Sequence, residues 1–189
     1  LFRSGVKNKA WVRTPVDAFI LAQLEEKGME PAPQAAKETL LRRVTFDLIG
    51  MPPTTAELQA FLADNSPQAF EKVVDRLLKS PHYGERWGRH WLDTARYADT
   101  KGPQFPLNRG EDYRFSSAWV YRDYVIAAFN DDKPYNQFVL EQIAADQLPR
   151  SADNSSLAGL GFLTVGERFS HTDDIINERI DAVCRGFLG

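Results

Sequence analysis

The chain has few residues of the types that build disulfides and metal sites: one cysteine (Cys184), two methionines and three histidines in 189 residues. One cysteine excludes an internal disulfide and a zinc site made of thiolates alone. No apolar run approaches 18 residues, so we expect no membrane-spanning helix. Lys and Arg (23) are outnumbered by Asp and Glu (26), giving a formal charge of −3. We therefore expect no nucleic-acid partner, because neutralising phosphates requires a basic excess.

Signature motifs of familiar enzymes are also missing. The sequence contains no GxGxxG, Walker, GxSxG or CxxC pattern, and its histidines do not show the HExxH spacing of zinc proteases. Alternation typical of strands is scarce, whereas hydrophobic residues make up 43% of the chain. That content predicts a packed core and excludes wholesale disorder.

The sequence does contain many residues that typically start or end helices. Thr14-Pro15, a Thr54-x-x-Glu57 capping box, Ser66-Pro67 and Ser80-Pro81 predict helix starts, the last opening a helix over residues 83–98. Gly28 and Gly50 predict helix ends. We expect a mainly α fold: an orthogonal bundle of about seven to eight helices in one domain over residues 1–189, with an irregular covering loop at 101–116. Because the chain begins at Leu1 and stops within an apolar pattern at Gly189, we also expect a fragment of a longer protein.

The densest group of chemically capable residues lies between Ser80 and Thr100. On one helix, Arg86, His90, Asp93 and Tyr97 would share a face. If this face lines an active site, His90 would carry a proton or bind a metal, and Asp93 would orient the His90 ring. The same pattern also fits a helix buried on several sides, whose polar groups tie its neighbours together. The absence of a nucleophile motif favours this structural interpretation.

Aromatic residues beside arginines form a second candidate group. Sugar rings stack on such faces while polar groups take their hydroxyls, although ordinary helix packing explains the pattern as well. The candidate binding residues are Trp87, Trp91, Arg96, Tyr113 and Trp119. His171, in a polar loop near Asp173 and Asp174, is a second candidate metal ligand after His90. Cys184 is expected to be a small packed residue.

Five ordered blocks resemble a known family. They are WVRTPVDAFILAQLE, TLLRRVTFDLIGMPPT, SPHYGERWGRHWLDTARYADT, WVYRDYVIAAFNDDKPYNQFVLEQIAADQLP and DIINERIDAVCRGFLG. The sequence is similar to domain-of-unknown-function family 1549, the planctomycete cytochrome-associated domain. Members are typically large exported proteins, many with a cytochrome-c-type domain upstream and a second domain of unknown function downstream, and their genes often lie near polysaccharide-degrading enzymes. The resemblance implies an extracytoplasmic location, those two domains as partners in the parent chain, and a link to polysaccharide.

The resemblance also implies haem c in the full-length protein. In the family, the block matching RGFLG runs into a CxxCH haem-attachment motif, but this chain stops at Gly189, just before it. The first hypothesis is therefore a haem-c oxidoreductase or electron-transfer module. His90, then His171, is the candidate for a distal ligand or a proton donor near the iron, and Met29 and Met51 are weaker ligand candidates.

Two alternatives remain. One is a non-catalytic carbohydrate-binding or scaffold module. The other is a glycan hydrolase using Glu85, Asp93 or Asp99, although Glu85 and Asp93 would lie about 12 Å apart along a helix axis, more than expected for a glycosidase pair.

Overall fold

The structure is a computed structural model that describes residues 5–103, 112–149, 154–166 and 171–188. Its contacts divide the chain into two compact units, Leu1–Thr39 and Leu40–Gly189, and each is described by itself. A single domain over residues 1–189 stays a prediction. No helix in the described ranges is long and apolar enough to cross a membrane.

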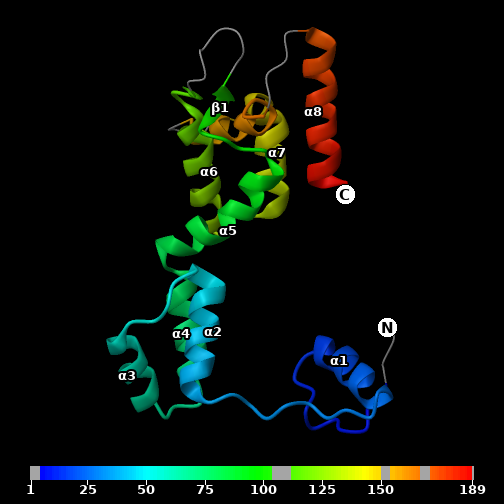
Figure 1. Cartoon of the computed structure of the whole chain (residues 1–189), viewed down its shortest axis with the longest axis vertical. Coiled ribbons are helices and arrows are strands. Elements are labelled where there is room, and N and C mark those ends of the chain that lie inside the picture. The colour runs from blue at the N-terminus through cyan, green and yellow to red at the C-terminus, as the bar shows by residue number, and fades with distance from the viewer. Residues whose placement is uncertain (1–4, 104–111, 150–153, 167–170, 189) are drawn as a thin grey trace. The chain divides into compact units, whose positions relative to one another are not determined.

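The predicted mainly α fold is confirmed (Figure 1). The described residues form eight α-helices, two 3-10 helices and one short hairpin. The α-helices are α1 (Pro15–Glu26), α2 (Lys37–Ile49), α3 (Thr55–Ala63), α4 (Ala69–Leu78), α5 (Pro81–Thr94), α6 (Ala118–Asn130), α7 (Tyr135–Ala144) and α8 (Thr172–Phe187). The 3-10 helices are η1 (Ala145–Gln147) and η2 (Ser155–Leu163), and the strands are β1 (Thr100–Pro103) and β2 (Asp112–Arg114).

The first unit is built around α1. Its start is the predicted cap: the Thr14 hydroxyl accepts from the Asp17 backbone N–H, and the Asp17 carboxylate accepts from the Thr14 N–H at 2.7 Å. Its end is also as predicted, with Gly28 at a φ of 66°, a conformation that glycine adopts without steric cost. Val6 and Leu21 are the buried apolar side chains of this unit.

Within the second unit, α2, α3 and α4 share a small core of Leu41, Phe61 and Ala69. The Thr54–Glu57 capping box opens α3 as predicted. The predicted start at Ser66-Pro67 is wrong, because α4 begins at Ala69 after Gln68. The Ser66 backbone N–H instead donates to the Asp64 carboxylate at 2.8 Å, so this serine belongs to the turn between the helices.

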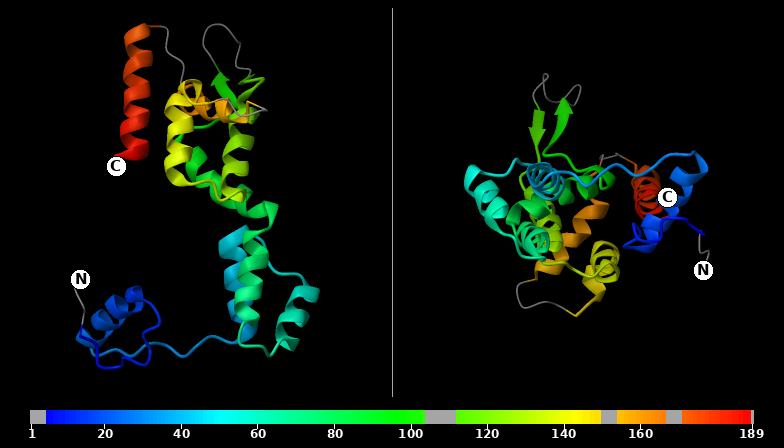
Figure 2. Two further views of the ribbon diagram at one scale, coloured as in Figure 1. Left: turned by 180° about the vertical axis from the view of Figure 1, so that it is seen from behind. Right: turned by 90° about the horizontal axis from the view of Figure 1, so that it is seen from below.

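The main core joins α5, α6, α7, η2 and α8. η2 packs against both α6 and α7 (Figure 2). The buried residues of this core are Ala95, Tyr121, Tyr124, Val125, Ala128, Phe138, Phe162 and Ala182.

Two predicted boundaries in this region are wrong. Helix α5 ends at Thr94 rather than near residue 98, because Arg96 adopts a left-handed conformation with a φ of 57°. The predicted irregular loop at 101–116 has paired flanks: β1 and β2 are antiparallel, with Thr100 opposite Arg114 and Pro103 opposite Asp112. Residues 104–111 of that loop lie outside the described part of the chain.

Candidate binding pocket

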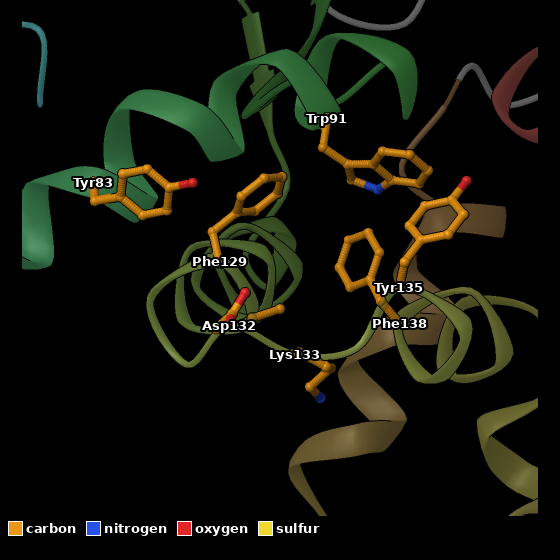
Figure 3. Close-up of a pocket in the computed structure, with 8 residues that line it drawn as sticks. Tyr83, Trp91, Phe129, Asp132, Lys133, Tyr135 and Phe138 are labelled. Atoms are coloured by element: carbon orange, nitrogen blue, oxygen red, sulfur yellow. The ribbon is translucent and has the colours of Figure 1, made fainter. Parts of the chain in front are cut away.

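A pocket of about 220 Å³ lies among α5, α6 and α7 (Figure 3). Aromatic rings form most of its wall, so we call it the aromatic pocket. The turn between α6 and α7 supplies its two charged residues. The lining residues are Tyr83, Trp91, Ala128, Phe129, Asp132, Lys133, Tyr135 and Phe138. Tyr83 and Trp91 stand eight positions apart on α5, so they project from similar sides of that helix. Tyr135 and Phe138 stand in the first turn of α7, at the i, i+3 spacing that puts two side chains on one face.

The turn between α6 and α7 brings these aromatic residues together. Asp131 ends α6, Asp132 follows in the left-handed conformation with a φ of 48°, and Pro134 precedes α7. The Lys133 N–H donates to the Ala128 carbonyl at 2.9 Å, which closes the end of α6. Aspartate tolerates the left-handed conformation better than most residues, so a short polar turn can reverse the chain here.

Trp91 is held firmly as one wall of the pocket. Its indole Nε1 donates to Gln142 Oε1 at 2.7 Å and lies 3.1 Å from Tyr121 Oη. Tyr121 also donates to Gln142 Oε1, at 2.6 Å, and burial raises the pKa of its hydroxyl. The Trp91 ring packs edge-on against Phe138, with centroids 5.0 Å apart. Its orientation is therefore fixed from both sides before any ligand arrives.

Among the described residues, Lys133 is the only cation that lines the pocket, and its charge is paired. Its ammonium group contacts the buried carboxylate of Glu141 and lies 4.9 Å from the Tyr124 ring centroid. Glu141 also accepts from Tyr124 Oη at 2.8 Å and Gln137 Nε2 at 2.9 Å. Burial works to raise the pKa of Glu141, but these three donors outweigh it and hold that pKa below its ordinary value. Burial, together with the hydrogen bond to the Glu141 carboxylate, raises the pKa of the Tyr124 hydroxyl.

A second, larger pocket of about 490 Å³ lies between the start of α6 and η2. Its polar side chains are the hydroxyls of Ser116, Ser117, Tyr121 and Thr164, and the rest of its wall is mostly apolar. None of its described lining residues carries a carboxylate or a positive charge, so it offers fewer groups for binding or catalysis than the aromatic pocket.

The structure places the predicted catalytic residues outside both pockets. His90 and Asp93 are exposed on α5, and the His90 ring packs against Trp87, with centroids 5.5 Å apart, rather than pairing with Asp93. Arg86 lies against Gly50 at the end of α2. Tyr97 lies beyond α5, so the expected four-residue helix face does not form.

Tyr97 instead pairs with a neighbour in sequence. Its hydroxyl donates to Asp99 Oδ1 at 2.6 Å. Burial together with this carboxylate raises the pKa of Tyr97 to about 12.

Of the predicted binding residues whose side chains are described, Trp91 alone lines the aromatic pocket. Trp87 is exposed and packs on Tyr83, and Trp119 is exposed on α6 with its indole donating to the Ser116 carbonyl at 3.1 Å. Arg96 forms an ion pair with Glu178, which ties the segment after α5 to α8. Tyr113 lies in β2, and its side chain falls outside the described part of the structure.

Neither pocket has the lining expected of a haem-binding site. His171 is exposed at the N-cap of α8, Met29 and Met51 are exposed, and neither pocket has a histidine, methionine or cysteine in its wall. No group of three or more potential metal ligands occurs among the described residues. Cys184 is exposed on α8, contrary to the expected packed position.

Sequence reasoning missed most of the pocket residues: Tyr83, Phe129, Asp132, Lys133, Tyr135 and Phe138. A usable signal was present, because the polar turn at 130–134 precedes two aromatic residues at i, i+3 spacing. That signal indicates a helix start with an aromatic face, but it does not say which other helix the face meets.

Comparisons with curated proteins, solved structures and family models place the chain in a family. No curated protein and no solved structure matches the chain. The family model PSCyt2, described as a protein of unknown function (DUF1549), matches residues 15–189, which is nearly the whole chain. This match confirms the resemblance found in the sequence, and the chain belongs to the DUF1549 family.

Proposed function

We propose that the chain is a carbohydrate-binding module and that its ligand occupies the aromatic pocket. The observation that carries this proposal is the gathering of five aromatic side chains around one small pocket, with a carboxylate at its edge. Tyr135, at 63% exposure, provides an accessible ring, while Trp91 and Phe138 form a fixed wall behind it.

This combination suits a sugar for a physical reason. One face of a pyranose ring carries C–H groups that pack on aromatic rings, while its hydroxyls need polar partners. The Asp132 carboxylate and the Tyr83 hydroxyl supply such partners at the same pocket. Its small volume, below the usual range for drug-sized ligands, fits a single ring or the end of a chain.

A direct test is calorimetric or NMR titration of the intact chain with monosaccharides and short oligosaccharides. We expect Tyr135→Ala to weaken sugar binding at least tenfold while leaving the fold intact, because this side chain is mostly exposed. Trp119→Ala is the matched control: Trp119 is also an exposed aromatic residue but lies outside the pocket. Equal loss in both variants, or no sugar binding by the unaltered chain, would contradict the proposal.

A second proposal concerns the parent protein and rests on the family. We propose that the parent is an extracytoplasmic oxidoreductase or electron-transfer protein that carries c-type haem outside the residues described here. The chain's part is then to hold a polysaccharide near the cytochrome-c-type domain. The test is a chain extended past Gly189 and matured in a host competent for cytochrome c assembly. A Soret band is expected, and a colourless extended protein would exclude haem in that extension.

A further inference from the structure

The charges at the aromatic pocket do not cancel within it. Lys133 is already paired with Glu141. In Figure 3 the Lys133 nitrogen points away from the aromatic rings, whereas the Asp132 carboxylate lies on the side of Phe129. Among the described contacts, Asp132 has no cationic partner. Among the described residues that line the pocket, a ligand therefore meets one carboxylate without a cationic partner and no unpaired cation.

The aromatic rings of the pocket also favour a cationic ligand. The face of an aromatic ring carries partial negative charge and attracts cations, most strongly when water is excluded. Tyr83, Trp91, Phe129, Tyr135 and Phe138 surround the pocket, and none of them carries a positive charge. The adjacent Lys133 shows this attraction inside the protein itself, since its nitrogen lies 4.9 Å from the Tyr124 ring centroid. An anionic sugar in this pocket would lie beside the Asp132 carboxylate with no unpaired cation among the described lining residues, so it is disfavoured.

We propose that the pocket selects an organic ammonium group, such as the protonated amine of an amino sugar, held between the Asp132 carboxylate and the aromatic rings. This inference rests on the proposed carbohydrate-binding function and deepens it by naming the charge of the ligand. Paired carboxylate and ring contacts distinguish an amine from the corresponding amide, because acetylation removes the positive charge.

The experiment compares glucosamine, N-acetylglucosamine, glucose and tetramethylammonium by calorimetric titration of the intact chain at pH 6, where the amine is protonated. We expect glucosamine to bind at least about tenfold more tightly than either neutral sugar, since cation–π and carboxylate contacts act together. Asp132→Asn is expected to abolish this preference without disturbing the turn, because asparagine also tolerates a left-handed conformation. Asp131→Asn, at an adjacent exposed carboxylate outside the pocket, is expected to retain the preference.

The possible outcomes separate the two proposals. Equal binding of glucosamine and glucose overturns the selectivity for ammonium and leaves carbohydrate binding standing. Binding of tetramethylammonium without any sugar supports the selectivity and overturns the carbohydrate function. Binding of none of the four compounds overturns both. A preference that survives Asp132→Asn as fully as Asp131→Asn also overturns the assignment to Asp132.

Discussion

Asn130 at the end of α6 accepts a hydrogen bond from the backbone N–H of Gly84 in α5, over 2.7 Å. The same amide donates back to the Pro81 carbonyl at 3.1 Å. One side chain thus satisfies a donor in the first turn of α5, where backbone N–H groups lack partners within the helix. Because Tyr83 lies in that turn and Phe129 precedes Asn130, the contact holds two walls of the aromatic pocket in register.

Because α5 and α6 pack closely, we expect substitution by alanine to have opposite effects on stability at Gly84 and Gly88. A Cβ on Gly84 would lie 2.3 Å from the Ile126 carbonyl oxygen, whereas one on Gly88 would make an ordinary 3.4 Å contact with Val125. We expect Gly84→Ala to lower the free energy of unfolding by about 2 kcal/mol or more through overpacking. Gly88→Ala should be neutral or stabilising by up to about 1 kcal/mol, from helix propensity. Urea unfolding measures both, and equal effects would contradict this packing.

The buried amide of Gln142 predicts a second stability effect. Gln142 accepts from both Trp91 and Tyr121. Gln142→Leu leaves those two donors without their acceptor, and each such loss costs about 1–3 kcal/mol. We expect a fall of about 2–4 kcal/mol in the free energy of unfolding by urea titration. Gln147→Leu, at an exposed position, is the control and should change it by less than about 0.5 kcal/mol.

Glu141 predicts a dependence of stability on pH. Its pKa is lower in the folded chain than its ordinary value of 4.5, so the unfolded chain takes up this proton first as pH falls. The stabilisation is therefore fully present above about pH 5 and is lost as pH falls below 4.5 toward the folded pKa. Glu141→Gln should cost about 2 kcal/mol at pH 7, because Lys133 loses its partner in a partly buried place.

The difference between the unaltered chain and Glu141→Gln should then shrink at pH 3.5, as measured by urea unfolding at both values. Asp75→Asn, at an exposed position on α4, serves as the control. A difference for Glu141→Gln that stays constant or grows at the lower pH would contradict the assignment.

The ion pair between Arg96 and Glu178 predicts how firmly α8 is held. Both side chains are mostly buried, and Arg96 also donates to the Phe162 carbonyl at 3.4 Å. We expect Glu178→Gln to lower the free energy of unfolding by about 1–2 kcal/mol and to speed amide hydrogen exchange in α8. Asp181→Asn removes an exposed pair with Arg185 within α8 and should cost only about 0.3–0.5 kcal/mol. Unchanged exchange in Glu178→Gln would mean that the ion pair does not anchor α8.

Local signals predicted the helix ends that depend on local chemistry. The capping boxes at Thr14 and Thr54 and the left-handed glycines at 28 and 50 stand where the sequence places them. Each of these features is made by residues within a few positions of one another. The end of α5 was mispredicted because Arg96 is an unusual residue for a left-handed conformation, and its ion pair with distant Glu178 supports that position.

In the candidate site, too, the sequence predicted a single residue but not its distant partners. Trp91 was identified from the sequence because two tryptophans on one polar helix are unusual, but the expected partners on that helix are not its partners in space. Those partners are Gln142 and Phe138, about fifty residues away on α7, and helical spacing within α5 carries no information about them. The expected proton carrier, His90, is exposed.

By itself, the sequence determined the helical character of this protein, most of its helix boundaries and its membership of the DUF1549 family. These properties follow from short-range hydrogen bonding, periodic hydrophobicity and the order of the sequence blocks. Only the tertiary structure decided which aromatic residues meet. It also decided that Lys133 is paired with Glu141, whereas Asp132 at the pocket has no cationic partner among the described residues. The physical reason is that packing and charge pairing act between surfaces brought together by folding, at separations along the chain that no local pattern encodes.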